Sequence, residues 1–222
     1  MIEIIPAILT DNLKTFENEL AEVEKLKPDS VQIDFADGQF VDQKTLLPAD
    51  LTASSLVQSS LVTEAHLMTE NPDRYLSDIK QLNFKRVTAH LSTLNEPTDF
   101  IQNAKQINLK VGIAINPEVK LDELEPFISK LDYVVFMTVI PGAQGHRFEE
   151  QVLEKVHLEF LHSIRNKHGY VTIEIDGGVK LDNIKEVIEV GAERIVVGSG
   201  IWKAKDHSKA YQGFVDKANK LS

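Results

Sequence analysis

The chain has 222 residues, of which 42% are hydrophobic, and its 24 basic and 34 acidic side chains give a formal net charge of −10. This length and apolar content are typical of a globular protein with a large core and exclude a disordered chain. The acidic balance argues against nucleic acid as a partner, because it repels a phosphate backbone. A small phosphorylated ligand needs only local donors and stays compatible with it.

The absence of cysteine excludes a disulfide framework, a cysteine-ligated zinc site and a thiol nucleophile. Residues 1–12 lack the basic region of a signal peptide, and no run approaches the roughly 18 apolar residues that a membrane span requires. We therefore expect a cytoplasmic protein without a membrane partner.

Short apolar runs rich in Val and Ile recur along the whole chain and are mostly bounded by Asp, Gly, Pro or Asn. They comprise residues 2–5, 31–35, 61–66, 86–89, 110–115, 133–137, 171–175 and 194–197. Runs of this length and composition predict strands that are buried on both faces.

Longer amphipathic runs separate these strands and predict helices. They comprise residues 11–26, 71–79, 121–129, 148–166, 181–190 and 207–221, and the weakest candidate is 48–58. Asp11 is the expected N-cap of the first helix, where apolar residues follow at three- and four-residue steps. Gly191 lies where the helix over 181–190 should end.

Eight strands that alternate with helices predict a parallel sheet with right-handed crossovers. With this chain length the pattern favours a closed (β/α)8 TIM barrel, an α/β fold, as one domain over residues 1–222. An open doubly wound sheet is the alternative, but its glycine fingerprint is missing from the first turn, Pro6-Ala7-Ile8-Leu9.

Polar side chains lie at the carboxyl ends of three predicted strands, where barrel enzymes carry their active sites. Gln32 and Asp34 share one face of a strand because they are two residues apart, and His66 and Asp176 end two others. If these side chains point into the barrel, they can bind a divalent metal ion or exchange protons as acid and base.

Glycine-bearing turns follow the last three predicted strands. Glycine lets backbone N–H groups approach an anion closely, and the loops after strands seven and eight are the usual phosphate site of this fold. We expect Gly177, Gly178, Gly198 and Ser199 to bind phosphate, with Gly142 and Gly145 as a third wall.

The chain resembles the ribulose-phosphate 3-epimerase family along nearly its whole length. The segments that carry the resemblance are Pro6-Ala7-Ile8-Leu9, residues 32–41, Ala65-His66-Leu67-Met68, and residues 71–75, 137–142, 174–178 and 197–199. The resemblance implies a metal-dependent isomerase of carbohydrate metabolism, in the pentose phosphate pathway, that inverts C3 of a ketopentose 5-phosphate through an enediolate.

The resemblance also implies roles for individual residues. Asp34 and Asp176 would be acid and base and also metal ligands, together with His66. From their positions we expect Ala7, His66, Met68 and Met137 to line the substrate pocket beside the phosphate turns, with core filling as the alternative for the two methionines. The substrate that it implies is D-ribulose 5-phosphate, converted to D-xylulose 5-phosphate, and relatives commonly form homo-oligomers.

The chain departs from the family pattern at several of these positions. The family has His-Ile-Asp where this chain has Gln32-Ile33-Asp34, so one imidazole ligand is replaced by a weaker amide donor. Ala7 replaces a serine, Ala36 a methionine and Gln39 a histidine, and residues 141–146 differ from the family's Pro-Gly-Phe-Gly-Gly-Gln. Because of these changes, the sequence does not determine whether the divalent ion is Zn, Fe, Mn, Co or Mg.

Three other functions remain open. Ala7 and Ala36 leave room for a ketohexose 6-phosphate, and Gln32 and Ala7 fit a non-catalytic phosphosugar-binding relative with a degraded metal site. A barrel decarboxylase or aldol-type synthase would need Asp-x-Lys-x-x-Asp at a strand end, which is missing near Asp34 and His66.

We interpret His90 as a packed or hydrogen-bonded histidine and Trp202 as a packing or interface residue.

Overall fold

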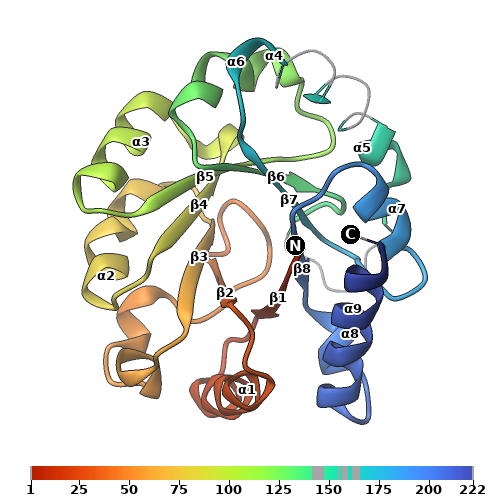
Figure 1. Ribbon diagram of the computed structural model, residues 1–222. Coiled ribbons are helices and arrows are strands. Elements are labelled where there is room, and N and C mark those ends of the chain that lie inside the picture. The colour runs from red at the N-terminus through yellow and green to blue at the C-terminus, as the bar shows by residue number, and fades with distance from the viewer. Residues whose placement is uncertain (1, 142–147, 155, 157–159, 162–165, 222) are drawn as a thin grey trace.

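The computed structural model describes residues 2–141, 148–154, 156, 160–161 and 166–221 (Figure 1). All eight strands are parallel and close into a barrel in the order β1-β2-β3-β4-β5-β6-β7-β8. The strands are β1 (Glu3–Ile8), β2 (Ser30–Ala36), β3 (Val62–Met68), β4 (Arg86–His90), β5 (Lys110–Ile115), β6 (Tyr133–Met137), β7 (Thr172–Asp176) and β8 (Arg194–Val197). The predicted TIM barrel is confirmed.

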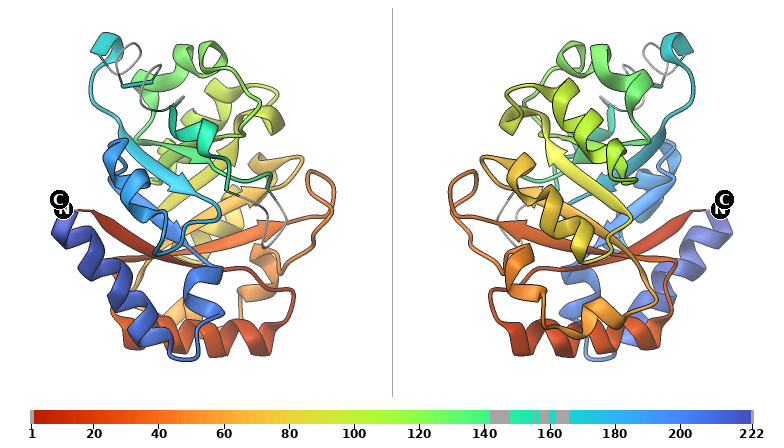
Figure 2. Two further views of the ribbon diagram at one scale, coloured as in Figure 1. Left: turned by 90° about the vertical axis from the view of Figure 1, so that its right-hand side faces the viewer. Right: turned by 90° about the vertical axis from the view of Figure 1, so that its left-hand side faces the viewer.

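Helices surround the ring of strands on the outside (Figure 1). They are α1 (Leu13–Leu26), α2 (Leu76–Gln81), α3 (Pro97–Gln106), α4 (Leu121–Leu124), α5 (Glu150–Glu154), α6 (Asn166–His168), α7 (Ile184–Glu189), α8 (Ser199–Trp202) and α9 (His207–Leu221). Figure 2 shows α9 beside α1, with the two chain ends close together. Within the described ranges, no helix combines the length and apolar character needed to cross a bilayer.

The predicted strands agree with the structure most closely in the second half of the barrel. The runs 110–115, 133–137 and 194–197 are β5, β6 and β8 without change. By contrast, β1 continues to Ile8 because Ala7 and Ile8 pair with Gln32 and Ile33 of β2, while Pro6 pairs with Val197 of β8. Pairing on both sides thus extends β1 beyond residue 5, where the strand was predicted to end.

The helices agree less well. The N-cap of α1 is Asn12 rather than Asp11, because the Asn12 side chain accepts a hydrogen bond from the Thr15 N–H at 3.0 Å. No helix was predicted over α3, which buries Phe100, Ile101 and Ala104. The helix predicted over 207–221 is confirmed as α9.

Several predicted helices are shortened or broken. The helix over 71–79 begins as a 3-10 helix, Pro72–Tyr75, and continues as α2, and the helix over 181–190 shortens to α7. The helix over 48–58 is wrong: two 3-10 helices, Pro48–Leu51 and Ser55–Gln58, stand there, and the Ser54 hydroxyl bonds the Leu51 carbonyl in competition with helical hydrogen bonds. The helix over 121–129 becomes α4 and a 3-10 helix, Glu125–Lys130, at Pro126, which lacks an N–H. Parts of 148–166 lie outside the described residues, and α5 is the helix found near its start.

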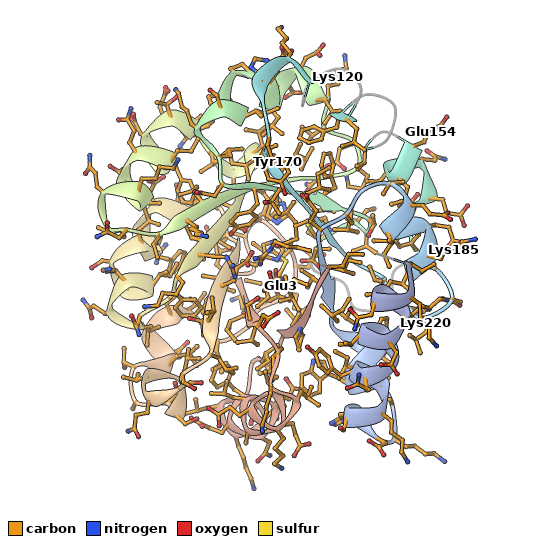
Figure 3. All side chains as sticks on the ribbon, in the orientation of Figure 1. Glu3, Lys120, Glu154, Tyr170, Lys185 and Lys220 are labelled. Carbon is orange, nitrogen blue, oxygen red and sulfur yellow. The ribbon has the colours of Figure 1, made fainter. Side chains whose placement is uncertain are left out.

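The amino-terminal half of the barrel interior holds a charged cluster. The Arg194 guanidinium donates to Glu174 at 2.6 Å, to Glu3 at 3.0 Å and to Glu64. Glu64 and Glu174 are fully buried, and burial together with the charge of Glu64 raises the pKa of Glu174 to about 8. Figure 3 places Glu3 near the middle of the ring of strands. The main apolar core lies outside this ring, between the strands and the helices, and two smaller apolar clusters of strand residues are separate from it.

Glu19 on α1 gives a test of stability against pH. Burial raises its pKa from 4.5 to about 7, and its Oε2 finds no hydrogen-bond partner among the described residues. The folded protein therefore holds a proton that the unfolded chain releases between pH 4.5 and 7, so stability falls as pH rises through this range. Glu19→Gln removes the charge that burial disfavours and is expected to raise the unfolding free energy at pH 8. The expected gain is only about 1 kcal/mol, because solvent screens a half-buried group.

Urea unfolding at pH 8 and at pH 4 measures this effect. The gain should vanish at pH 4, where the carboxyl is protonated in both states, and Glu154→Gln on the exposed surface (Figure 3) should change neither value. An equal gain at both pH values would show that charge is not its cause.

Candidate active site

Four polar side chains converge on the carboxyl-terminal mouth of the barrel from three strands. Gln32 and Asp34 come from β2, His66 from β3 and Asp176 from β7, and Asp34 is the register partner of His66. Because strand side chains alternate between faces, Gln32 and Asp34 both point inward. The predicted convergence of these side chains is therefore present in the structure.

The acidic and imidazole groups are close enough to share one ion. The His66 Nδ1 lies 3.1 Å from the Asp34 Oδ1 and 3.3 Å from the Asp176 Oδ2, and one ligand atom from each residue lies within 4.8 Å of the others. Ligands at about 2.1 Å from an octahedral ion stand about 3.0 Å apart. Two carboxylates and one imidazole also suit divalent transition metals. The group therefore fits a divalent ion.

Gln32 lies at the centre of this group. Its Nε2 donates to the Asp34 Oδ1 at 2.9 Å and to the Asp176 Oδ2 at 2.8 Å, and it stands 3.2 Å from the His66 Nδ1. An amide N–H2 faces two carboxylates because its oxygen would be repelled there. For Gln32 to offer its Oε1 to a cation, the amide has to turn over.

The two carboxylates determine the charge of His66. Burial opposes a charged imidazole, but hydrogen bonds to Asp176 and Asp34 and their charges outweigh it and raise the pKa of His66 to about 10. Burial raises the pKa of Asp34, and the hydrogen bond to His66 opposes that rise. Without a bound cation, His66 therefore carries a positive charge beside the two carboxylates at neutral pH.

A cavity of about 300 Å³ opens above these groups. Asp34, His66 and Asp176 form part of its wall, and so do other predicted site residues, namely Ala7, Met68, Met137, Gly177, Gly178, Gly198 and Ser199. Gly142 and Gly145 lie outside the described residues. Ala36, expected to widen the pocket, is fully buried and is not part of this wall.

The turn after β7 requires glycine. Gly177 and Gly178 have φ angles of +116° and +63°, which side-chain-bearing residues rarely adopt. A Cβ on Gly177 would also lie 2.5 Å from the Val139 Cγ2. The turn thus brings the backbone itself to the cavity wall.

Two cationic residues of this cavity, Lys180 and Lys203, are not among the predicted site residues. Each follows one of the glycine turns by a few residues, and that position was the available signal. Trp202 also lines the cavity, and its Nε1 donates to the Ala7 carbonyl at 2.6 Å, so it joins α8 to β1.

A closed parallel barrel with an acid–imidazole group and glycine turns at its carboxyl mouth defines a TIM-barrel enzyme. Its sequence matches the ribulose-phosphate 3 epimerase family over residues 3–202. It is 33% identical over 211 residues to ribulose-phosphate 3-epimerase of Bacillus subtilis, covering 95% of this chain and 96% of the relative. The enzyme of that name from Aquifex aeolicus is 32% identical over 204 residues, covering 91% and 90%.

The chain belongs to the ribulose-phosphate 3-epimerase family. The predicted isomerase class is confirmed at this level. The structure of KGPDC from Streptococcus mutans is similar in fold, with a TM-score of 0.73 at 13% identity over 99% of this chain and 98% of that one.

Proposed function

We propose that this protein interconverts D-ribulose 5-phosphate and D-xylulose 5-phosphate, with Asp34 and Asp176 as acid and base. The supporting observation is that both carboxylates reach one cavity from β2 and β7 and are held by the same Gln32 amide. Relatives that share about a third of the residues carry the name of this activity.

In this reaction one aspartate removes the proton from C3 of the ketose, and the electron pair moves toward the C2 carbonyl oxygen to form the enediolate. The other aspartate then donates a proton to C3 from the opposite face, which inverts the centre. The raised pKa of Asp34 suits a carboxyl that must hold a proton during part of the cycle. A divalent ion bound by Asp34, His66 and Asp176 would supply positive charge beside the developing enediolate.

The part of the cavity wall formed by the glycine turns suits the substrate's phosphate. The turns of Gly177–Gly178 and Gly198–Ser199 bring backbone to the wall, and Lys180 and Lys203 place two positive charges beside them. In a protein with a net charge of −10, these lysines offset the repulsion that a phosphate would meet from Asp34 and Asp176.

Proton exchange with solvent tests the proposal directly. Purified protein is incubated with D-ribulose 5-phosphate in D2O, with Mn²⁺, Co²⁺ or Zn²⁺ added and with a chelator in a parallel sample. We expect deuterium at C3 and the appearance of xylulose 5-phosphate. Absence of deuterium at C3 with every ion would refute the epimerase proposal, and a faster reaction with a ketohexose 6-phosphate would change the substrate.

A phosphosugar-binding protein without catalysis is the second candidate. The observation that favours it is the Gln32 amide, whose Nε2 donates to both carboxylates and so satisfies them with a group of the chain itself. Metal analysis of the protein as purified separates the two. Stoichiometric metal supports the enzyme, whereas a metal-free protein that binds sugar phosphate and exchanges no C3 proton supports the binder.

Changing Gln32 is expected to change the choice of ion. Gln32→His replaces an amide that must turn over with an imidazole that zinc prefers, so the affinity for Zn²⁺ should rise roughly tenfold or more relative to Mg²⁺. Competition with a chromophoric chelator measures both affinities. Gln102→His, on the exposed surface of α3, is the control, and an unchanged preference in Gln32→His would show that residue 32 does not contact the ion.

A further inference from the structure

His90 connects the site to a buried chain of hydrogen bonds. It ends β4 with no solvent exposure, and its Nε2 lies 2.9 Å from the His66 Nε2. Its Nδ1 lies 2.8 Å from the Asn116 Oδ1, and the Asn116 Nδ2 donates to the Glu118 Oε1 at 3.2 Å. The interpretation of His90 as a hydrogen-bonded histidine is confirmed, and one of its two partners is the candidate metal ligand His66.

The direction of each hydrogen bond follows from Glu118, the last residue in this series of hydrogen bonds. The Glu118 Oε1 accepts from the Asn116 Nδ2, so the Asn116 N–H2 is on the Glu118 side and the Asn116 Oδ1 is turned toward His90. That oxygen only accepts, so the His90 Nδ1 must carry a hydrogen. A neutral His90 then has a lone pair on Nε2.

That lone pair faces the His66 Nε2, which must therefore be the donor of the bond between the two rings. The Phe40 ring packs against His90, with the two ring centroids 4.8 Å apart. The other nitrogen of His66, Nδ1, is left to face Asp34 and Asp176. The acceptor on His90 thus determines which edge of the His66 ring meets the carboxylates.

We propose that His90 and Asn116 are positioning residues, which hold hydrogen on the His66 Nε2 and aim the His66 Nδ1 at the two carboxylates. The inference rests on the proposed function because it concerns the same site. It assigns no contact with substrate to either residue. Outer hydrogen-bond partners of a histidine ligand typically change metal affinity by about 10- to 100-fold.

Two substitutions of His90 test the direction of these hydrogen bonds. Leucine removes the acceptor, whereas glutamine can accept from the His66 Nε2–H through its oxygen and donate to the Asn116 Oδ1 through its nitrogen. We expect His90→Leu to weaken Co²⁺ binding, measured by visible absorption, by about 10- to 100-fold, and His90→Gln to recover most of it. His168→Leu, which removes a histidine bonded to Glu125, is the control.

Through-bond NMR measures the position of the hydrogen between His66 and His90 without depending on metal binding or activity. In protein labelled with ¹⁵N-histidine, we expect a ¹⁵N–¹⁵N coupling across the hydrogen bond between the His66 Nε2 and the His90 Nε2, with the hydrogen on His66. A hydrogen on the His90 Nε2, or Co²⁺ affinity unchanged in a folded His90→Leu protein, would overturn the proposal. If the protein lacks epimerase activity but shows this coupling, the proposed function fails and the positioning role stands.

Discussion

Asp176→Asn is expected to lower kcat for epimerisation by about 10²- to 10⁴-fold, because the amide can neither remove nor return a proton. Asp34→Asn should have an effect of the same size. The remaining carboxylate serves only one face of C3, so each variant should still exchange the C3 proton of one epimer with solvent. The two variants should prefer opposite epimers, which ¹H NMR in D2O resolves for ribulose and xylulose 5-phosphates measured separately.

This asymmetry distinguishes acid–base roles from a loss of metal ligands. If Asp34 and Asp176 served only to bind an ion, both variants would lose exchange from both epimers, and excess metal would restore it. Asp99→Asn, on the exposed side of α3, is the matched control and should keep full activity. Equal residual exchange of both epimers in both variants would contradict the two-base proposal.

Arg194→Met is expected to cause the largest loss of stability. Arg194 bonds Glu3, Glu64 and Glu174. Methionine would leave the two fully buried groups, Glu64 and Glu174, without the guanidinium that bonds them, whereas Glu3 would keep Arg86 at 3.8 Å. Removing one partner from a buried ion pair typically costs about 3–5 kcal/mol. For a chain of this length, that corresponds to a fall in Tm of roughly 10 °C, measured by circular dichroism during heating.

Neutralising the carboxylates should rescue the variant if stranded charge is the cause. Glu64→Gln and Glu174→Gln, added to Arg194→Met, are expected to restore a large part of the lost stability, whereas each alone in the native background should not stabilise the fold by a comparable amount. Arg74→Met, at an exposed arginine, is the control. A loss below about 0.5 kcal/mol in Arg194→Met would show that the cluster does not support the barrel.

Much of the candidate site could be predicted because a barrel brings strand ends together. Asp34 and Asp176 lie far apart in the chain, yet each stands at the carboxyl end of an apolar run, and parallel strands in a closed sheet share one rim. The cavity wall includes Ala7, Met68 and Met137 for the same reason. The Gln32 amide could be located but not oriented, because its orientation depends on which oxygens face it.

The sequence by itself determined the eight strands and their parallel order, because buried strands need continuous Val- and Ile-rich runs that polar and turn residues interrupt. Only the tertiary structure decided the extension of β1, the Arg194 cluster and the contact of His90 with His66. Each of these depends on partners from other strands, such as β2 for Ala7 or β3 for His90. Local periodicity records which face of a strand is buried, but not which side chain it meets there.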